Sequence, residues 1–206
     1  DLVQMSSAGS SLAVHAFRYA NESFNPTFSI ERRQPHIEVG QLVIADVQSG
    51  IINHSVTLAY DVRYSGVKEL RLDIPTNLIE TIRNDSKLVQ ESVITPRPDD
   101  LADDYTAWQL TSNRELFGEF QIELSWIESL ADLEVGSATS VSLSPLTPQE
   151  VHRSWGQVVI KKAENLDVVP AGSDGVRPID PRYDLKLGST DMQIEGAAVA
   201  MEFHQE

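Results

Sequence analysis

The chain has 206 residues, of which 41% are hydrophobic and 23% are charged, a balance typical of a globular protein with a substantial core. Its 16 basic and 31 acidic residues give a net charge of −15, which disfavours binding to nucleic acid or to anionic lipid. The absence of cysteine excludes disulfides, thiolate metal sites and cysteine nucleophiles. The apolar runs are too short for a transmembrane helix, so we do not expect the chain itself to span a membrane.

Three candidate strands precede the clearest pattern of the sequence. Residues 10–19 are apolar on both faces, which is typical of a buried strand. Residues 27–33 predict a second strand that carries its phenylalanine and its isoleucine inward. Residues 36–47 predict a third, in which the apolar residues change from odd to even positions at Gly40. One extra residue would restore a single apolar face, so we expect a β-bulge at this glycine.

The clearest alternation of apolar and polar residues lies between residues 55 and 75. It continues on both sides of a Ser65–Gly66 turn, which predicts a two-stranded hairpin with one apolar face. Residues 105–111 and 120–126, separated by a loop, predict a second hairpin of the same kind. An apolar sheet face needs a cover, so we expect the second hairpin to lie in a sheet that faces the first.

The rest of the chain carries weaker signals. Residues 76–104 mix helical and strand-like spacing, whereas residues 155–162 predict a short strand. The last strand changes phase at Gly196, where we expect a second bulge or kink. Its residues 197–206 can be laid over residues 13–22, which suggests one unit of a tandem array followed by the opening strand of the next.

These patterns indicate an all-β protein, an antiparallel β-sandwich of immunoglobulin-like or jelly-roll-like type, with about ten short strands and little helix. We expect one large unit over residues 1–206, excised from a longer chain. A connection rich in serine and proline allows a subdivision into a main sandwich over residues 1–147 and a smaller β-element over residues 148–206. The smaller element would end in the first strand of a following unit.

Four segments carry a resemblance to other proteins: residues 16–19 (AFRY), 28–33 (FSIERR), 60–75 (YDVRYSGVKELRLDIP) and 175–181 (GVRPIDP). In this order they look like uncharacterised β-rich regions of very large bacterial envelope proteins. The resemblance spans most of the chain, but its motifs are structural and include no known catalytic residue. It implies an extracytoplasmic location, in the periplasm or at the cell surface, as part of a membrane-anchored protein.

One acidic cluster is a candidate metal site. Asp99, Asp100, Asp103 and Asp104 lie close together in the sequence, and carboxylate oxygens are ligands that Ca²⁺ accepts. The cluster lacks the Asp-x-Asp-x-Asp-Gly pattern of a dedicated calcium loop, so a solvated acidic loop is the alternative. The histidines lack the paired spacing of a zinc site, and we expect no cofactor other than calcium.

Aromatic side chains are the usual means by which β-sandwiches hold sugar rings. Tyr105, Trp108 and Trp155 are candidates for such a platform, provided that their rings are exposed and coplanar. Trp126 is a weaker candidate, because it alternates in phase with apolar neighbours and therefore belongs in the core. The core is the alternative position for the other two tryptophans as well.

The sequence contains no nucleophile elbow, phosphate-binding loop or nucleotide fingerprint. Our main hypothesis is a non-enzymatic structural or adhesive module of a large cell-envelope protein, whose partners are neighbouring modules of the same chain or other envelope proteins. The alternative is a carbohydrate- or calcium-binding module. A hydrolase would require a cleft with perturbed titratable groups, since the members of a catalytic triad need not be adjacent in sequence.

Overall fold

The structure, a computed structural model, describes residues 25, 27–131, 134–172, 175–188 and 190–205. The chain divides into two compact units, Asp1–Arg32 and Arg33–Glu206, and most of the first unit lies outside the described residues. The strand predicted over residues 10–19, and with it the internal echo, therefore has no described counterpart. The fold below is that of the second unit.

The predicted strand over residues 27–33 is wrong. This stretch has no strand, and its two apolar side chains do not point inward: Phe28 is 63% exposed and Ile30 is 94% exposed. A short segment of alternating apolar and polar residues does not form a strand unless another strand pairs with that segment.

The described part of the chain contains eleven strands and one short 3-10 helix, and no α-helix. The strands are β1 His36–Gln48, β2 Ile51–Pro75, β3 Arg83–Asn84, β4 Gln90–Val93, β5 Tyr105–Ser129, β6 Thr147–Gln149, β7 Arg153–Lys162, β8 Val176–Ile179, β9 Lys186–Leu187, β10 Thr190–Asp191 and β11 Ala197–Gln205. The 3-10 helix η1, Thr76–Leu78, lies in the region of mixed signals. Among these residues no helix has the length and apolar character needed to cross a membrane.

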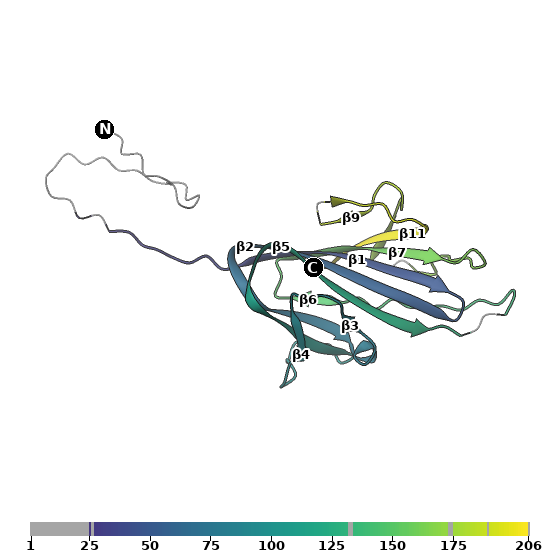
Figure 1. The fold of residues 1–206 in the computed structure, drawn as a ribbon, viewed down its shortest axis with the longest axis horizontal. Helices are drawn as coiled ribbons and strands as arrows, with labels where there is room; N and C mark the ends of the chain where they lie inside the picture. The colour runs from purple at the N-terminus through teal and green to yellow at the C-terminus, as the bar shows by residue number, and fades with distance from the viewer. Residues whose placement is uncertain (1–24, 26, 132–133, 173–174, 189, 206) are drawn as a thin grey trace. The chain divides into compact units, whose positions relative to one another are not determined.

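Nine strands form one sheet in the order β3-β5-β2-β1-β7-β11-β8, with β4 paired to β5 and β6 paired to β2 (Figure 1). The strands β9 and β10 form a separate two-stranded sheet. The pairs are antiparallel except for β1 and β7, which run parallel. The prediction of an all-β, sandwich-like fold is confirmed, with this parallel pair as the exception to its antiparallel character.

The two predicted hairpins are wrong, because each is one long bent strand. Strands β2 and β5 have 25 residues each, and they pair with each other along both halves. The register shifts between Val62 and Val67, where Tyr64 has a φ of 70°, and Gly118 on the partner strand has a φ of 77°. Such left-handed residues within paired strands produce a bulge and a bend. The Ser65–Gly66 segment thus bends the chain without reversing it.

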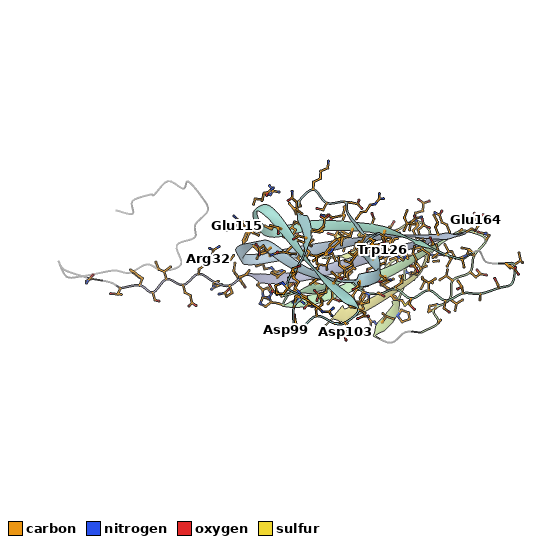
Figure 2. The ribbon with its side chains drawn as sticks, turned by 90° about the horizontal axis from the view of Figure 1, so that it is seen from below. Arg32, Asp99, Asp103, Glu115, Trp126 and Glu164 are labelled. Carbon is orange, nitrogen blue, oxygen red and sulfur yellow. The ribbon has the colours of Figure 1, made fainter. Side chains whose placement is uncertain are left out.

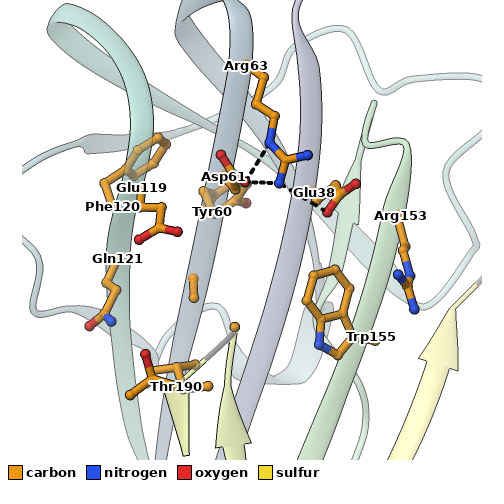
Figure 3. A pocket seen from close by; sticks show the side chains of 13 residues that line it. Glu38, Tyr60, Asp61, Arg63, Glu119, Phe120, Gln121, Arg153, Trp155 and Thr190 are labelled. Carbon is orange, nitrogen blue, oxygen red and sulfur yellow. Dashed lines mark hydrogen bonds and ion pairs between the residues drawn. The ribbon is translucent and has the colours of Figure 1, made fainter.

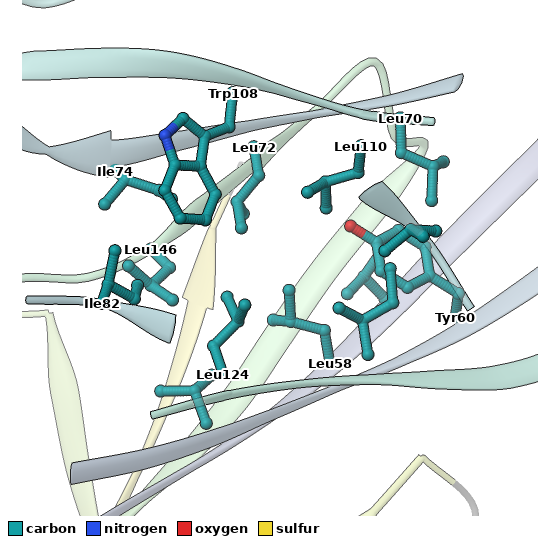
Figure 4. Close-up of a cluster of buried hydrophobic side chains, with 14 of the residues drawn as sticks. Leu58, Tyr60, Leu70, Leu72, Ile74, Ile82, Trp108, Leu110, Leu124 and Leu146 are labelled. Atoms are coloured by element: carbon teal, nitrogen blue, oxygen red, sulfur yellow. The ribbon is translucent and has the colours of Figure 1, made fainter. Parts of the chain in front are cut away.

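The bend folds the β2–β5 ribbon over itself, so that its two halves enclose the main core. Figure 4 shows Leu72 and Leu110 from one half above Leu58 and Leu124 from the other. Residues 120–126 therefore do not face residues 55–62, as we expected, but lie beside them in the same sheet. The cover comes instead from the second half of each strand. We call the side of the sheet that faces this core the inner face, and the opposite side the outer face.

The bulge predicted at Gly40 is absent from β1. Its pairing with β2 continues without a register shift from His36 to Gln48. The apolar residues change phase because β1 is buried on both sides: Val39 packs in the inner core, whereas Leu42 packs in a second cluster with Val159, Leu185 and Ala200. A strand covered on both faces shows no single apolar phase.

Two predictions near the end of the chain agree with the structure more closely. The strand predicted over residues 155–162 is confirmed as most of β7. Strand β11 does have a register shift, between Ala197 and Val199, directly after the Gly196 at which we expected an irregularity. The alternating residues before this glycine lie outside β11, however, so the phase change also marks the start of a separate strand.

Candidate binding site

A pocket of about 660 Å³ lies on the outer face, across β5, β2, β1 and β7 (Figure 3). The strand register sets its side chains in two rows that cross the sheet. One row is charged and consists of Glu119, Asp61, Glu38 and Arg153. The next row consists of the polar Gln121, the small residues Ala59 and Gly40, and the aromatic Trp155. We call this pocket the outer groove.

The outer groove is hollow because its middle positions carry little bulk. Ala59 and Gly40 sit side by side on the two central strands. A Cβ atom on Gly40 would lie 3.4 Å from an indole carbon of Trp155 and 3.1 Å from the backbone nitrogen of Gly188. Gly40 therefore lets both the indole and the turn between β9 and β10 lie close against the sheet, which is a usual role of glycine within a strand.

The Trp155 ring forms one wall of the outer groove. Its side chain is half-buried, and Figure 3 shows the ring face on, with the broad side toward the viewer. The guanidinium carbon of Arg153 lies 5.0 Å from the centre of the indole, within the range of a cation–π interaction. The wall thus combines an aromatic surface with a positive charge.

A guanidinium–carboxylate network occupies one end of the outer groove. Arg63 Nε donates to Asp61 Oδ2 at 2.8 Å, and its Nη2 contacts the same oxygen. The same Nη2 lies 3.9 Å from Glu38 Oε2, and the other oxygen of that carboxylate lies 3.2 Å from His36 Nε2. The hydrogen bond with Asp61 raises the pKa of Arg63 above its ordinary value. This end of the groove is therefore a fixed set of charged hydrogen-bonding groups.

The opposite wall and the far rim add further polar groups. Glu119 and Gln121 are exposed on β5 and line the outer groove, and Thr190 lies at its rim (Figure 3). Three carboxylates and two guanidinium groups thus line the site. Donors and acceptors of hydrogen bonds are both present, and so is an aromatic surface, a combination that suits recognition of a polar ligand.

The four aspartates proposed for calcium do not assemble into a site. All four are exposed, and Figure 2 shows Asp99 and Asp103 at the surface. Asp100 Oδ1 accepts from Arg71 Nη1 at 2.9 Å, and Asp103 lies 3.6 Å from an Arg97 nitrogen. Within the described ranges no group of three or more metal-ligating side chains converges. The cluster instead holds ion pairs with neighbouring arginines.

The predicted aromatic platform is not formed. Trp108 is 5% exposed and belongs to the main core (Figure 4), as does Trp126 at 7%. The Tyr105 hydroxyl donates to the Pro145 carbonyl at 3.2 Å, and partial burial raises the pKa of this tyrosine. Of the proposed platform residues only Trp155 lines the outer groove, because Trp108 points to the inner face of the bent strand.

No local sequence pattern distinguishes most of the other residues that line the outer groove. In the sequence Glu119 has the pattern of an ordinary charge on the outward face of a strand, and Asp61 and Arg63 belong to the polar half of an alternating pattern. Only the pairing of β5 with β2, and of β1 with both β2 and β7, brings these positions into adjacent rows. The one local signal was Gly40, an isolated glycine within a strand pattern.

A buried histidine lies on the inner face, away from the outer groove. His54 is 3% exposed and stacks on Trp126, with ring centres 4.7 Å apart and an interplanar angle of 10°. Its Nε2 lies 3.1 Å from Glu128 Oε2, and its Nδ1 has no hydrogen-bond partner among the described residues. Burial lowers the pKa of His54, and the hydrogen bond with Glu128 opposes this effect only in part.

No protein-family model matches the chain, and no curated protein matches it by sequence. Among solved structures, native leukotriene A4 hydrolase from Saccharomyces cerevisiae is similar over 82% of this chain and 29% of its own, with 10% identity and a TM-score of 0.36. The M1 zinc metallopeptidase from Deinococcus radiodurans is similar over 83% of this chain and 38% of its own, with 14% identity and a TM-score of 0.29. Similarity at this level assigns no function to the chain.

Proposed function

We propose that this chain is a non-enzymatic adhesive β-sandwich module of a large cell-envelope protein, and that it makes contact with its partner through the outer groove. The observation that supports this proposal most directly is the charged row on four neighbouring strands, held by Arg63 between Asp61 and Glu38. Side chains fixed on paired strands keep their geometry better than side chains on loops, so they form a preorganised contact surface.

The chemistry of the outer groove favours binding over catalysis. Two of its carboxylates are already engaged by Arg63, and its aromatic ring is accompanied by Arg153. These are groups that recognise a ligand by hydrogen bonding and ring contact. Support for the extracytoplasmic location comes from the sequence resemblance to bacterial envelope proteins.

A sedimentation experiment tests the adhesive role. The purified chain is mixed with isolated cell envelopes of the organism that produces it, and the bound fraction is measured for the wild type and for a variant that combines Glu38→Ala with Trp155→Ala. We expect the wild type to sediment with the envelopes and the double variant to remain in solution. Tyr183→Ala, a change at a side chain that is 78% exposed and absent from the lining of the outer groove, is the matched control.

Two results would count against the proposal. If the wild type does not bind envelopes, the adhesive role is wrong. If the double variant binds as well as the wild type while its circular dichroism spectrum is unchanged, the contact surface lies elsewhere.

A further inference from the structure

From the arrangement of its walls we infer that the outer groove binds a neutral glycan. This inference rests on the proposed function and names the ligand of the same site. The Trp155 ring lies against the sheet over Gly40 with a broad face toward the open side of the groove (Figure 3). A flat aromatic face that is supported from behind is well suited to contact the C–H face of a pyranose ring.

The outer groove offers a mixture of hydrogen-bonding groups in addition to this ring. Asp61 and Arg63 form a carboxylate–guanidinium pair at one end of the outer groove, and Gln121 offers an amide on the opposite wall. Neighbouring hydroxyl groups of a sugar each donate and accept a hydrogen bond. A site that presents donors and acceptors side by side can satisfy both, whereas a site of one charge cannot.

The charged groups of the outer groove disfavour anionic and cationic ligands. An anionic ligand would approach the carboxylates of Glu38, Asp61 and Glu119 in a protein with a net charge of −15. A cationic peptide would have to compete with Arg63 for two of these carboxylates. A neutral ligand is not repelled by the carboxylates and does not have to displace Arg63 from them.

The distance between the two walls of the outer groove indicates the length of the ligand. Trp155 lies on β7 and Gln121 on β5, and the two strands are separated by β1 and β2. Three strand spacings correspond to about 14 Å between the backbones of the two walls. A single pyranose ring that rests on Trp155 would leave the β5 wall without a contact. The geometry therefore favours an oligosaccharide whose chain crosses the strands.

Titration with defined probes tests the inference. The probes are cellohexaose, mannohexaose, maltohexaose and the fully N-acetylated chitohexaose as neutral glycans, a galacturonic acid hexamer as an anionic glycan, and hexalysine as a cationic peptide. Binding is measured by calorimetry and by tryptophan fluorescence. Trp155 is the tryptophan whose fluorescence should respond to a ligand in the groove, because Trp108 and Trp126 are buried. We expect at least one neutral hexamer to bind, and neither charged probe to bind more tightly.

Variants locate the binding site within the outer groove. Trp155→Ala should weaken binding of the neutral hexamer about tenfold or more, and Trp155→Tyr should restore part of the loss because it keeps an aromatic face. Arg63→Gln should weaken binding about tenfold through loss of charged hydrogen bonds. Tyr183→Ala, which is again the control at an exposed ring outside the lining, should leave the affinity unchanged.

The results separate this inference from the adhesive role on which it rests. If no neutral hexamer binds, or if one binds equally well to Trp155→Ala, the glycan assignment is wrong. Hexalysine binding that depends on Trp155 would also overturn it and identify a cationic peptide site. Groove-dependent sedimentation with envelopes, without glycan binding, would leave the adhesive role standing and remove only the glycan.

Discussion

The two faces of the same strands differ in what their side chains do. Along β2, Leu58 and Val62 point to the inner face and are fully buried, whereas Ala59 and Asp61 between them line the outer groove. The inner face is mainly apolar, apart from a few buried polar side chains such as His54, and the folded-over ribbon covers its main core. The outer face carries a buried apolar cluster around Leu42, and polar and charged side chains line its groove. This difference indicates that the inner face provides the stability of the fold and the outer face provides its recognition surface.

The two kinds of surface meet on β1. Its inner side is continuous with the main core, but its outer side changes from the apolar cluster at Leu42 to the charged row at Glu38 within four residues. Gly40 stands at the boundary, under both Trp155 and the β9–β10 turn. A substitution at this position should therefore affect both surfaces, and substitutions on either side of it should affect only one.

The largest effect is expected from the inner face. Leu58 is 0% exposed, and Leu58→Ala should lower the free energy of unfolding by about 3 kcal/mol, because the lost methyl groups leave a cavity between the two halves of the ribbon. Ser55→Ala, an exposed position on the outer side of the same strand, should change it by less than about 0.5 kcal/mol. Urea denaturation measures both. Equal losses in the two variants would contradict the division of roles between the faces.

Gly40→Val is the next largest change. Its side chain would collide with the Gly188 backbone nitrogen, which a Cβ already approaches to 3.1 Å, and with Trp155. We expect a loss of about 2 kcal/mol, typical of overpacking, together with a displaced indole. Urea denaturation and the fluorescence of Trp155 measure the two effects. Gly172→Val, where a Cβ would meet no atom within 4 Å, is the control, and a comparable loss there would show that the cost is not steric.

How much of this arrangement was predictable from the sequence depends on whether a feature is local. The alternation in residues 55–75 correctly separated Leu58 and Leu72 from the polar positions, because period two is a property of the strand itself. The pattern did not distinguish a hairpin from a bent strand. A serine–glycine pair allows either, and the choice depends on which distant segment pairs with each half.

The candidate site was harder to predict because it depends on the pairing of strands that are distant in the sequence. Trp155 was selected as an aromatic residue, but Glu38, Asp61 and Glu119 have the pattern of ordinary solvent-facing charges. They form one row only through the register of three strands that are far apart in the sequence. The apolar residues of β1 change phase at Gly40, which by itself predicts a bulge. The change instead reflects burial of β1 on both faces.

A smaller effect, which depends on pH, should come from His54 on the inner face. Its pKa in the folded protein is lowered below the ordinary value of 6.5. As the pH falls through 6.5, the unfolded chain binds a proton at this histidine that the folded chain does not, so acidification favours unfolding. We expect the free energy of unfolding to decline between pH 7.5 and pH 5.5, and to decline less in His54→Gln.

The pH dependence has two informative controls. Glu128→Gln removes the group that partly opposes the lowering of the His54 pKa, so its stability should decline more steeply with acidification. His204→Gln, a change at an exposed histidine, should keep the wild-type dependence. A decline in His54→Gln as steep as in the wild type would assign the effect to other groups.

The smallest effect on stability is expected at Arg63. This residue tests whether the outer face contributes to the stability of the fold. Its side chain is 51% exposed, and an exposed ion pair loses most of its Coulomb energy to solvent screening. The urea midpoint of Arg63→Gln should therefore stay close to that of the wild type, although the guanidinium contacts both Asp61 and Glu38. The same variant should still reduce binding at the outer groove. A midpoint shift as large as that of Leu58→Ala would mean that the charged row holds the sheet together, and the outer face would then have to be regarded as structural.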